Sequence, residues 1–149
     1  MATLTENTPR IHGNSNIVGL PVIAADIIYQ GSAVGLSSGY ARPLVAGDSF
    51  MGFAIDKVDN SGGSAGDKNV ELEKEGELCS VAIGSLVITS VGAPVYMSDD
   101  NTFTLTAASN SLIGYVSKFV SAGVGDIVFS VAGCRTYTAA LAAAIAADA

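Results

Sequence analysis

The sequence predicts an all-β protein, a small antiparallel β-barrel or β-tulip-like sandwich with an extended N-terminal arm and a short Ala-rich C-terminal helix. Three observations predict this class. Short runs of β-branched and aromatic residues follow one another, turn residues separate them about every 8–12 residues, and several runs alternate between apolar and polar side chains. Such alternation is typical of antiparallel strands that have one packed and one solvated face.

Residues 1–16 are expected to form the arm, because Thr, Asn, Ser, Pro and Gly dominate them and the apolar residues Leu4 and Ile11 stand alone. A polar terminus can be a disordered tail, or it can be a segment that orders when it binds a partner. In the second case, we expect Leu4, Arg10, Ile11 and Ile17 to contact the partner.

Residues 17–133 are expected to form the β domain. The expected strands lie at residues 26–30, 32–36, 49–58, 69–75, 77–83, 94–97, 102–106, 111–120 and 126–132. In one of them Val70 and Leu72 alternate with glutamates, and in another Phe103 and Leu105 alternate with threonines. Turns are expected at residues 46–48, 98–101 and 121–126, and the longest loop is expected at residues 59–69.

Residues 134–149 are expected to form a helical tail. Alanine dominates residues 136–149, and alanine has the highest helix propensity. Tyr137, Leu141 and Ile145 follow one another at intervals of four, which places them on one stripe of a helix. Because so short a helix is only marginally stable alone in water, we expect the stripe to pack against the domain's own flank or against a sister subunit.

Few charges are available to cover the surface of this chain. Charged residues make up 14% of it, below the ordinary fraction of about 25%, and hydrophobic residues make up 49%. The chain is therefore expected to bury apolar surface against partners, to have an exterior rich in small polar residues, or both. Its basic residues are scattered and the formal net charge is -7, so neither nucleic acid nor an anionic membrane surface is an expected partner.

Residues suited to metal or catalytic chemistry are sparse. His12 is the single histidine and lies in the arm, so neither a zinc site nor a Ser-His-Asp triad is expected. Cys79 and Cys134 are expected to be buried free thiols, with a disulfide left open. The acidic cluster at residues 99–101 is expected to be a turn, because it lacks further calcium ligands. We therefore expect no metal, no cofactor and no enzymatic activity.

The sequence shows neither a secretory signal nor an apolar span, so the chain is expected to be soluble and made in a reducing cytoplasm.

One alternative is a hydrolase, because two nearby carboxylates can cleave glycosidic bonds. The densest charge includes Glu71, Glu73, Glu75 and Glu77. The first three fall on one face of an expected strand, and the pattern implies no apolar cleft around them. A solvated strand face is therefore the preferred interpretation, and it also discourages association of strand edges.

Four stretches of scaffold sequence occur in a characteristic order across residues 26–132. They are "IIYQGSAVGL", "RPLVAGDSFMGFAIDKVDNSGG", "VELEKEGEL" and "PVYMSDDNTFTLTAASNSLIGYVSKFVSAGVGDIVFSV". In this order the chain resembles the capsid decoration, or cement, proteins of tailed bacteriophages. The Ala-rich tail does not match that family.

The resemblance implies a small β-barrel or β-tulip-like domain on the outer surface of an expanded icosahedral head. It implies homotrimers at three-fold and quasi-three-fold positions, which clamp major capsid protein subunits against the pressure of packaged DNA. Terminal arms commonly make the capsid contacts in such proteins. The expected location is the virion surface, after a stay in the host cytoplasm during assembly.

Another alternative is a virion- or surface-displayed module that binds glycans or a host. It predicts an aromatic platform on exposed loops. The candidates are Tyr29, Tyr40, Tyr96, Tyr115 and Tyr137, most of which fall in expected strands.

Overall fold

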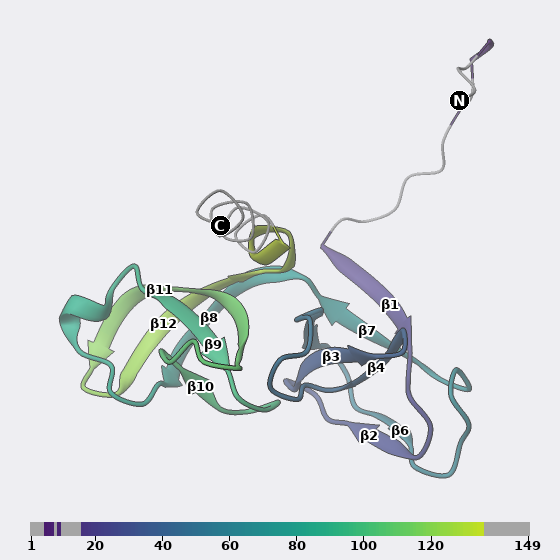
Figure 1. Cartoon of the computed structure of the whole chain (residues 1–149), viewed down its shortest axis with the longest axis horizontal. Coiled ribbons are helices and arrows are strands. Elements are labelled where there is room, and N and C mark those ends of the chain that lie inside the picture. Colours follow the sequence, from purple (N-terminus) through teal and green to yellow (C-terminus); the bar gives the residue numbers. More distant parts are fainter. Residues whose placement is uncertain (1–4, 8, 10–15, 136–149) are drawn as a thin grey trace, which may run out of the picture.

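The structure, a computed structural model, describes residues 5–7, 9 and 16–135 (Figure 1). Within them the strands are β1 (Ile17–Pro21), β2 (Asp26–Ile28), β3 (Ala33–Ser37), β4 (Tyr40–Pro43), β5 (Gly52–Ala54), β6 (Val58–Asn60), β7 (Asn69–Glu73), β8 (Glu75–Ala82), β9 (Pro94–Met97), β10 (Phe103–Thr104), β11 (Ser111–Ser121) and β12 (Val124–Ser130). A 3-10 helix, η1 (Ile88–Ser90), precedes β9, and residues 131–135 form a short helix after β12. The all-β class with antiparallel sheets and a short C-terminal helix is thus confirmed.

The first lobe is a five-stranded antiparallel sheet in the order β1-β7-β5-β3-β4, accompanied by the short pair β2-β6. Val18 of β1 pairs with Leu72 of β7, and Leu20 pairs with Val70. Val70 and Leu72 are buried while their neighbours along the strand are exposed, so the predicted alternation is confirmed. The core of this lobe consists of Val22, Ile28, Val34, Ala41, Ala54, Val70 and Leu72.

The second lobe is a five-stranded antiparallel sheet in the order β10-β9-β11-β12-β8, which curls into a half-barrel (Figure 1). The turns predicted at residues 98–101 and 121–126 are confirmed, because β10 pairs with β9 and β12 pairs with β11 across them. The core of this lobe takes in side chains from both sheets: Ala33, Leu44, Phe50, Phe53, Ile83, Leu86, Val95, Met97, Ile113, Val116, Ile127 and Phe129.

The chain passes from the first lobe to the second at Lys74, between β7 and β8. The Lys74 N–H donates to the Asn16 carbonyl oxygen at 2.8 Å, and the Lys74 carbonyl oxygen accepts the Val131 N–H at 2.9 Å. Because these groups bond to different elements, the strand leaves the first sheet here and joins the second. The lobes also meet where the Ala33 N–H donates to the Asp100 carbonyl oxygen at 3.0 Å.

Two strands, β1 and β4, were missed by the sequence pattern. Each is short and ends in a proline, Pro21 or Pro43. Proline lacks a backbone donor, which weakens the sequence signal of a strand. It is tolerated here because β1 and β4 are the two edges of their sheet.

The single strand predicted at residues 49–58 is wrong, because β5 covers only its middle, β6 begins at its last residue, and the two strands belong to different sheets. The turn predicted at residues 46–48 is present, since the Asp48 N–H donates to the Val45 carbonyl oxygen at 2.9 Å. It connects β4 to β5, which both pair with β3 and not with each other. The C-terminal helix begins at residue 131, a few residues before the predicted boundary.

Candidate functional site

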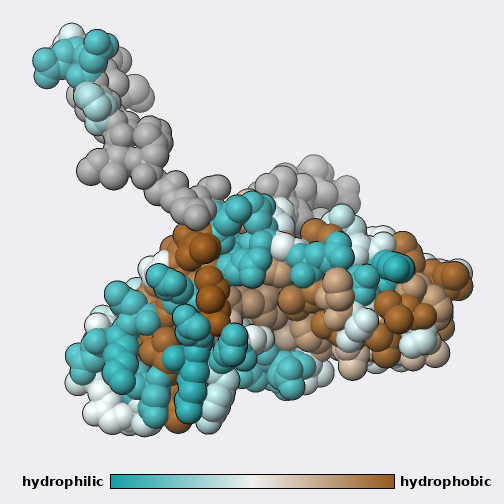
Figure 2. Space-filling model, turned by 180° about the vertical axis from the view of Figure 1, so that it is seen from behind, coloured by the Kyte–Doolittle hydropathy of each residue, from teal (hydrophilic) through white to brown (hydrophobic). Residues whose placement is uncertain are grey.

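Apolar side chains are exposed at the end of the second lobe formed by η1 and the last residues of β11. Val87, Ile88, Val91 and Val120 are 52%, 68%, 47% and 46% exposed, and we call these four residues the apolar ridge. Figure 2 shows apolar side chains gathered at this end of the molecule. Exposed apolar patches of this kind mark interaction surfaces on soluble proteins.

The backbone around η1 holds the ridge side chains outward. Leu86 is buried in the core, and its carbonyl oxygen accepts the Gly123 N–H at 3.0 Å. The next residue, Val87, donates its N–H to the Ser90 hydroxyl at 3.2 Å, which closes the turn. With Leu86 fixed inside and the turn closed, the apolar side chains that follow face solvent.

The predicted arm contacts are placed only in part. Ile17 is the first residue of β1, pairs with Glu73 and is 41% exposed. Leu4, Arg10 and Ile11 lie outside the described residues. Described arm residues 5–7 and 9 are exposed, so the side chains placed at this end of the chain are open to a partner.

A groove of about 370 Å³ lies on the second lobe between β9, β11, β12 and the start of the C-terminal helix. We call it the outer groove; Pro94, Leu112, Tyr115, Val128 and Cys134 line it, among others. Tyr137, Leu141 and Ile145, predicted to pack against the domain or a sister subunit, lie outside the described residues.

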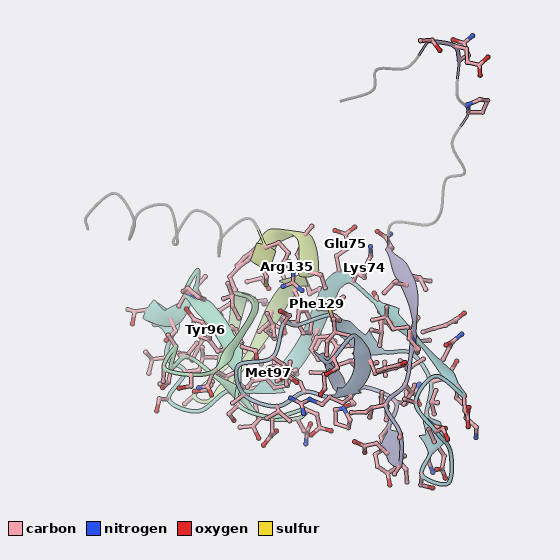
Figure 3. All side chains as sticks on the ribbon, turned by 45° about the vertical axis from the view of Figure 1, so that its right-hand side comes forward. Lys74, Glu75, Tyr96, Met97, Phe129 and Arg135 are labelled. Carbon is pink, nitrogen blue, oxygen red and sulfur yellow. The ribbon has the colours of Figure 1, made fainter. Side chains whose placement is uncertain are left out.

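The short C-terminal helix is fixed to the first lobe through Arg135. Its Nη2 donates to the Phe50 carbonyl oxygen at 3.2 Å and lies 3.2 Å from the Met51 Sδ. Figure 3 shows Arg135 above Phe129, with Lys74 and Glu75 beside it at the junction of the lobes.

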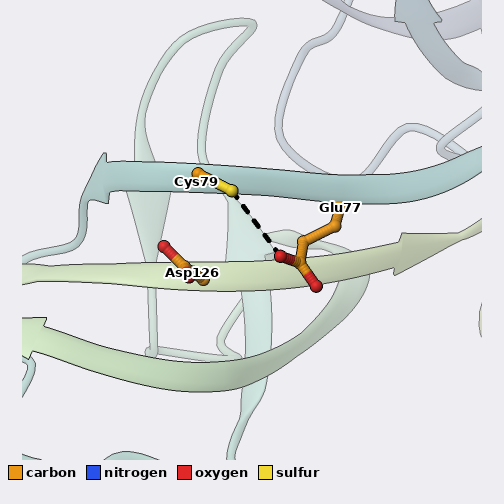
Figure 4. A group of neighbouring side chains, drawn as sticks. All are labelled: Glu77, Cys79 and Asp126. Carbon is orange, nitrogen blue, oxygen red and sulfur yellow. Dashed lines mark hydrogen bonds between the residues drawn. The ribbon is translucent and has the colours of Figure 1, made fainter.

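A thiol and two carboxylates meet on β8 and β12 (Figure 4). The Cys79 Sγ donates to the Glu77 Oε1 at 3.5 Å, and the ligand atoms of Glu77, Cys79 and Asp126 lie within 4.8 Å of one another. Asp126 is buried and already accepts the Ser80 N–H at 2.8 Å. The hydrogen bond to Glu77, and then the charge of Asp126, raise the pKa of the Cys79 thiol. A protonated thiol is a poor nucleophile, so this shift lowers the reactivity of Cys79.

Both cysteines were predicted to be buried free thiols, and burial is confirmed for one of them. Cys134 is buried, as expected, whereas Cys79 is exposed, and neither forms a disulfide. The alternation along β8 puts Glu77 and Cys79 on one face, which the sequence could have indicated. The approach of Asp126 depends on the pairing of β8 with β12, which the sequence does not give.

The acidic strip does not form one strand face. Glu71 and Glu73 belong to β7 in the first sheet, whereas Glu75 and Glu77 belong to β8 in the second. All four side chains are exposed, which is the arrangement of a solvated surface. Their spread over two sheets weakens the case for a paired-carboxylate hydrolase.

A polar groove of about 380 Å³ lies where the lobes meet, between residues 29–32 and the turn at residues 100–101. Tyr29 is 56% exposed at its rim, and the Lys57 Nζ lies 5.2 Å from the ring centroid. The groove also carries the amides of Gln30 and Asn101 and the carboxylate of Asp100.

The other described tyrosines are less suited to an aromatic platform. Tyr40 and Tyr96 are half-buried in strands, and Tyr115 is exposed on β11, while Tyr137 lies outside the described residues.

Comparisons with known proteins give no family for this chain. No protein-family model matches it, and a search of curated proteins finds no match. In the part of the chain that the structure describes, no helix is both long enough and apolar enough to cross a membrane.

Proposed function

We propose that the protein is a structural virion protein that binds the outer surface of an expanded bacteriophage capsid and stabilises the head against internal DNA pressure. The observation that carries the proposal is the apolar ridge. Ile88, 68% exposed, is the most exposed of its four residues. A chain with 14% charged residues that exposes such side chains together is suited to bind a protein partner.

The arm and the ridge provide two contact regions at separate places on the molecule. The arm leaves the first lobe at Ile17, whereas η1 lies at the far end of the second lobe (Figure 1). One copy could therefore contact two neighbouring major capsid protein subunits, with Leu4, Arg10, Ile11 and Ile17 as the arm contacts. We propose homotrimers at three-fold and quasi-three-fold positions, where many modest contacts add up through avidity.

The build of the domain also supports a mechanical and non-catalytic role. Both sheets contribute side chains to the larger core cluster, so the lobes are coupled by apolar packing. The exposed thiol is held protonated beside Glu77, which limits its reactivity.

The test uses purified protein and expanded heads that lack it. Co-sedimentation measures copies bound per major capsid subunit, and heating then measures the temperature at which heads rupture. We expect saturation near one copy per subunit and a higher rupture temperature. A well-folded protein that does not bind would remove the proposal.

Matched variants test the two contact regions separately. Ile88→Ser should weaken binding by about tenfold, because it removes the most exposed apolar side chain of the ridge. Val45→Ser removes a side chain that is 49% exposed on the first lobe and should leave binding unchanged. Deletion of residues 2–16 tests the arm. Equal binding by all variants would show that neither region contacts the capsid.

A second candidate function, a glycan-binding module, is supported by the polar groove at Tyr29. Exposed aromatic rings stack on sugars, and the carboxylate and amides of Asp100, Asn101 and Gln30 are groups that bind hydroxyls. If heads are not bound, binding to host surface polysaccharide should be measured, with Tyr29→Ala as the variant. Equal retention of Tyr29→Ala and the unmodified protein on the polysaccharide would count against this groove.

A further inference from the structure

Glu77, Cys79 and Asp126 lie close together on the outer face of the second sheet, and we call them the thiol–carboxylate cluster (Figure 4). Ile127, which follows Asp126 on β12, is fully buried in the core. Leu78, between Glu77 and Cys79 on β8, packs against the same core. Because side chains alternate between the two faces of a sheet, the cluster lies on the face opposite the core.

Two irregularities in the strand pairing set the position of Asp126. The pairing of β12 with β8 shifts register between Gly125 and Ile127, on either side of Asp126. Its pairing with β11 shifts just before Lys118, the residue paired with Asp126. Bulges of this kind re-aim a side chain. The aspartate is fixed in this position because its Oδ1 accepts the Ser80 N–H at 2.8 Å.

Asp126 is a buried carboxylate that lacks an ion-pair partner among the described residues. It is 9% exposed, and only its Oδ1 accepts a hydrogen bond from the part of the chain that the structure describes. Lys118 is its neighbour across the ladder, but the Lys118 side chain is exposed and forms no salt bridge with it. Buried charges in proteins are paired or coordinate metals. The second carboxylate oxygen of Asp126 is therefore free to bind a cation.

We propose that the thiol–carboxylate cluster binds one zinc ion through the Cys79 Sγ and one carboxylate oxygen each from Glu77 and Asp126. Zinc accepts thiolate and carboxylate ligands at about 2.3 Å and about 2.0–2.2 Å, in a tetrahedral arrangement. With three protein ligands, its fourth position is open to water. Calcium and magnesium take oxygen ligands, so the thiol disfavours them. On binding, the Cys79 S–H bond breaks, its proton passes to water, and a bond forms between Sγ and zinc.

The distances within the cluster suit this ion. Tetrahedral bonds of these lengths place neighbouring ligand atoms about 3.4–3.6 Å apart. The Cys79 Sγ and the Glu77 Oε1 are 3.5 Å apart, and the ligand atoms of all three residues lie within 4.8 Å of one another. Glu77 and Cys79 are exposed, so they can move the short remaining distance toward the fixed Asp126. The sequence alone predicted no metal here, because Asp126 joins the cluster only through the pairing of β8 with β12.

The ion would join β8 to β12 from the outer face of the sheet. β8 is an edge strand of the second sheet, and it is the strand with which the chain enters the second lobe after Lys74. A ligand that binds the folded chain and not the unfolded chain stabilises the fold. Zinc should therefore raise the temperature of thermal unfolding. This role does not depend on capsid binding.

Zinc titration of the reduced, metal-free full chain tests the proposal, in competition with a coloured zinc indicator. We expect saturation at one ion per chain. Cys79→Ser, Glu77→Gln and Asp126→Asn should each weaken binding by more than about tenfold, because even groups that only orient a metal ligand contribute about 10–100-fold. Glu75→Gln is the matched control, since it removes the same charge from the same strand outside the cluster. It should bind zinc as the unmodified protein does.

Two further measurements report on the thiol and on the fold. Zinc should slow maleimide labelling of Cys79 by about tenfold or more, because the metal occupies the thiolate. Cobalt, used in place of zinc, should give the charge-transfer absorption of a cobalt–thiolate bond. Zinc should raise the unfolding temperature of the unmodified protein and of Glu75→Gln. Cys79→Ser should show neither the cobalt absorption nor the rise in unfolding temperature. Its exposed position makes this variant the one expected to fold normally.

Three outcomes overturn the proposal. Folded protein without saturable zinc binding would remove it outright. Equal zinc affinity in Cys79→Ser, Glu77→Gln and the unmodified protein would place the ion elsewhere, and loss of binding in His12→Ala would then assign it to the arm. Cobalt binding without the thiolate absorption would show that the carboxylates bind the ion without Cys79.

Discussion

Phe53 of β5 and Phe129 of β12 meet edge to face at the junction of the two lobes, with ring centroids 4.7 Å apart and planes at 77°. Phe50 packs edge to face against both rings, and Phe103 stacks on Phe53 at 6.3 Å. Because Phe50 and Phe53 come from the first lobe and Phe103 and Phe129 from the second, this cluster couples the two sheets. Aromatic pairs add about 0.5–1.5 kcal/mol each beyond their buried area.

Removal of the Phe129 ring should therefore destabilise the whole domain. Phe129 is 1% exposed, and Phe129→Ala should lower the free energy of unfolding by about 3–5 kcal/mol. Urea denaturation measured by circular dichroism checks this value. Val45→Ala, at a side chain 49% exposed, should change stability by less than about 0.5 kcal/mol. A Phe129→Ala protein as stable as the control would contradict the coupling of the lobes through this ring.

Arg42 and Asp48 form the ion pair that closes the turn before β5. The Arg42 Nε donates to the Asp48 Oδ2 at 3.0 Å, and its Nη2 donates to Oδ1 at 2.8 Å. The Val45 N–H also donates to Oδ2 at 3.1 Å. Burial acts to raise the pKa of Asp48, but these hydrogen bonds and the Arg42 charge outweigh it, so the pKa lies below its ordinary value.

The Asp48 pair should make the protein lose stability in acid. A carboxyl whose folded pKa lies below its unfolded value contributes its full stabilisation above the unfolded pKa, about 3.9. That contribution is lost as the pH falls through the folded pKa. Thermal unfolding between about pH 2 and 7 should therefore show a smaller acid-induced fall in Asp48→Asn, which also starts about 1–2 kcal/mol less stable at neutral pH. Asp56→Asn, at an exposed side chain, should follow the unmodified protein.

Gly114 of β11 lies directly against the backbone of β12, where it pairs with Phe129. A Cβ at this position would overlap the carbonyl oxygen of Val128, which belongs to the backbone and cannot move without breaking the ladder. Gly114→Ala should therefore destabilise the domain by about 1–3 kcal/mol or more. Gly19→Ala in β1, where a Cβ meets nothing within 4 Å, should be neutral or stabilise by up to about 1 kcal/mol. Equal effects in denaturant titrations would contradict this geometry.

The parts of the fold that were predicted are those fixed by local patterns. Val70 and Leu72 alternate with charged neighbours, and the Asp and Asn residues at 98–101 form the expected turn. The junction at Lys74 could not be predicted, because its backbone groups bond to Asn16 and to Val131, which are far away in sequence. In the sequence, Gly76 was the more obvious boundary between two strands, and the strands expected at residues 69–75 and 77–83 lie on either side of it.

The apolar ridge was not predicted for a related reason. Val87, Ile88 and Val91 form part of an apolar stretch that can equally lie in a core. Their exposure follows from Leu86, which takes the buried position and is tied to the β11–β12 turn through Gly123. A pattern of apolar residues alone does not say which of them the rest of the chain covers.

The pKa of the Cys79 thiol on β8 depends most on its neighbour Glu77. Its hydrogen bond to the Glu77 Oε1 stabilises the protonated form and raises its pKa. Glu77→Gln removes the charge, so the thiolate fraction at pH 8 and the rate of maleimide labelling at Cys79 should rise by about twofold or more. Glu75→Gln, on the same face of β8, should leave the rate unchanged. Peptide mass spectrometry separates labelling of Cys79 from that of the buried Cys134. Equal labelling rates in the two variants would show that Glu77 does not raise the pKa of the Cys79 thiol.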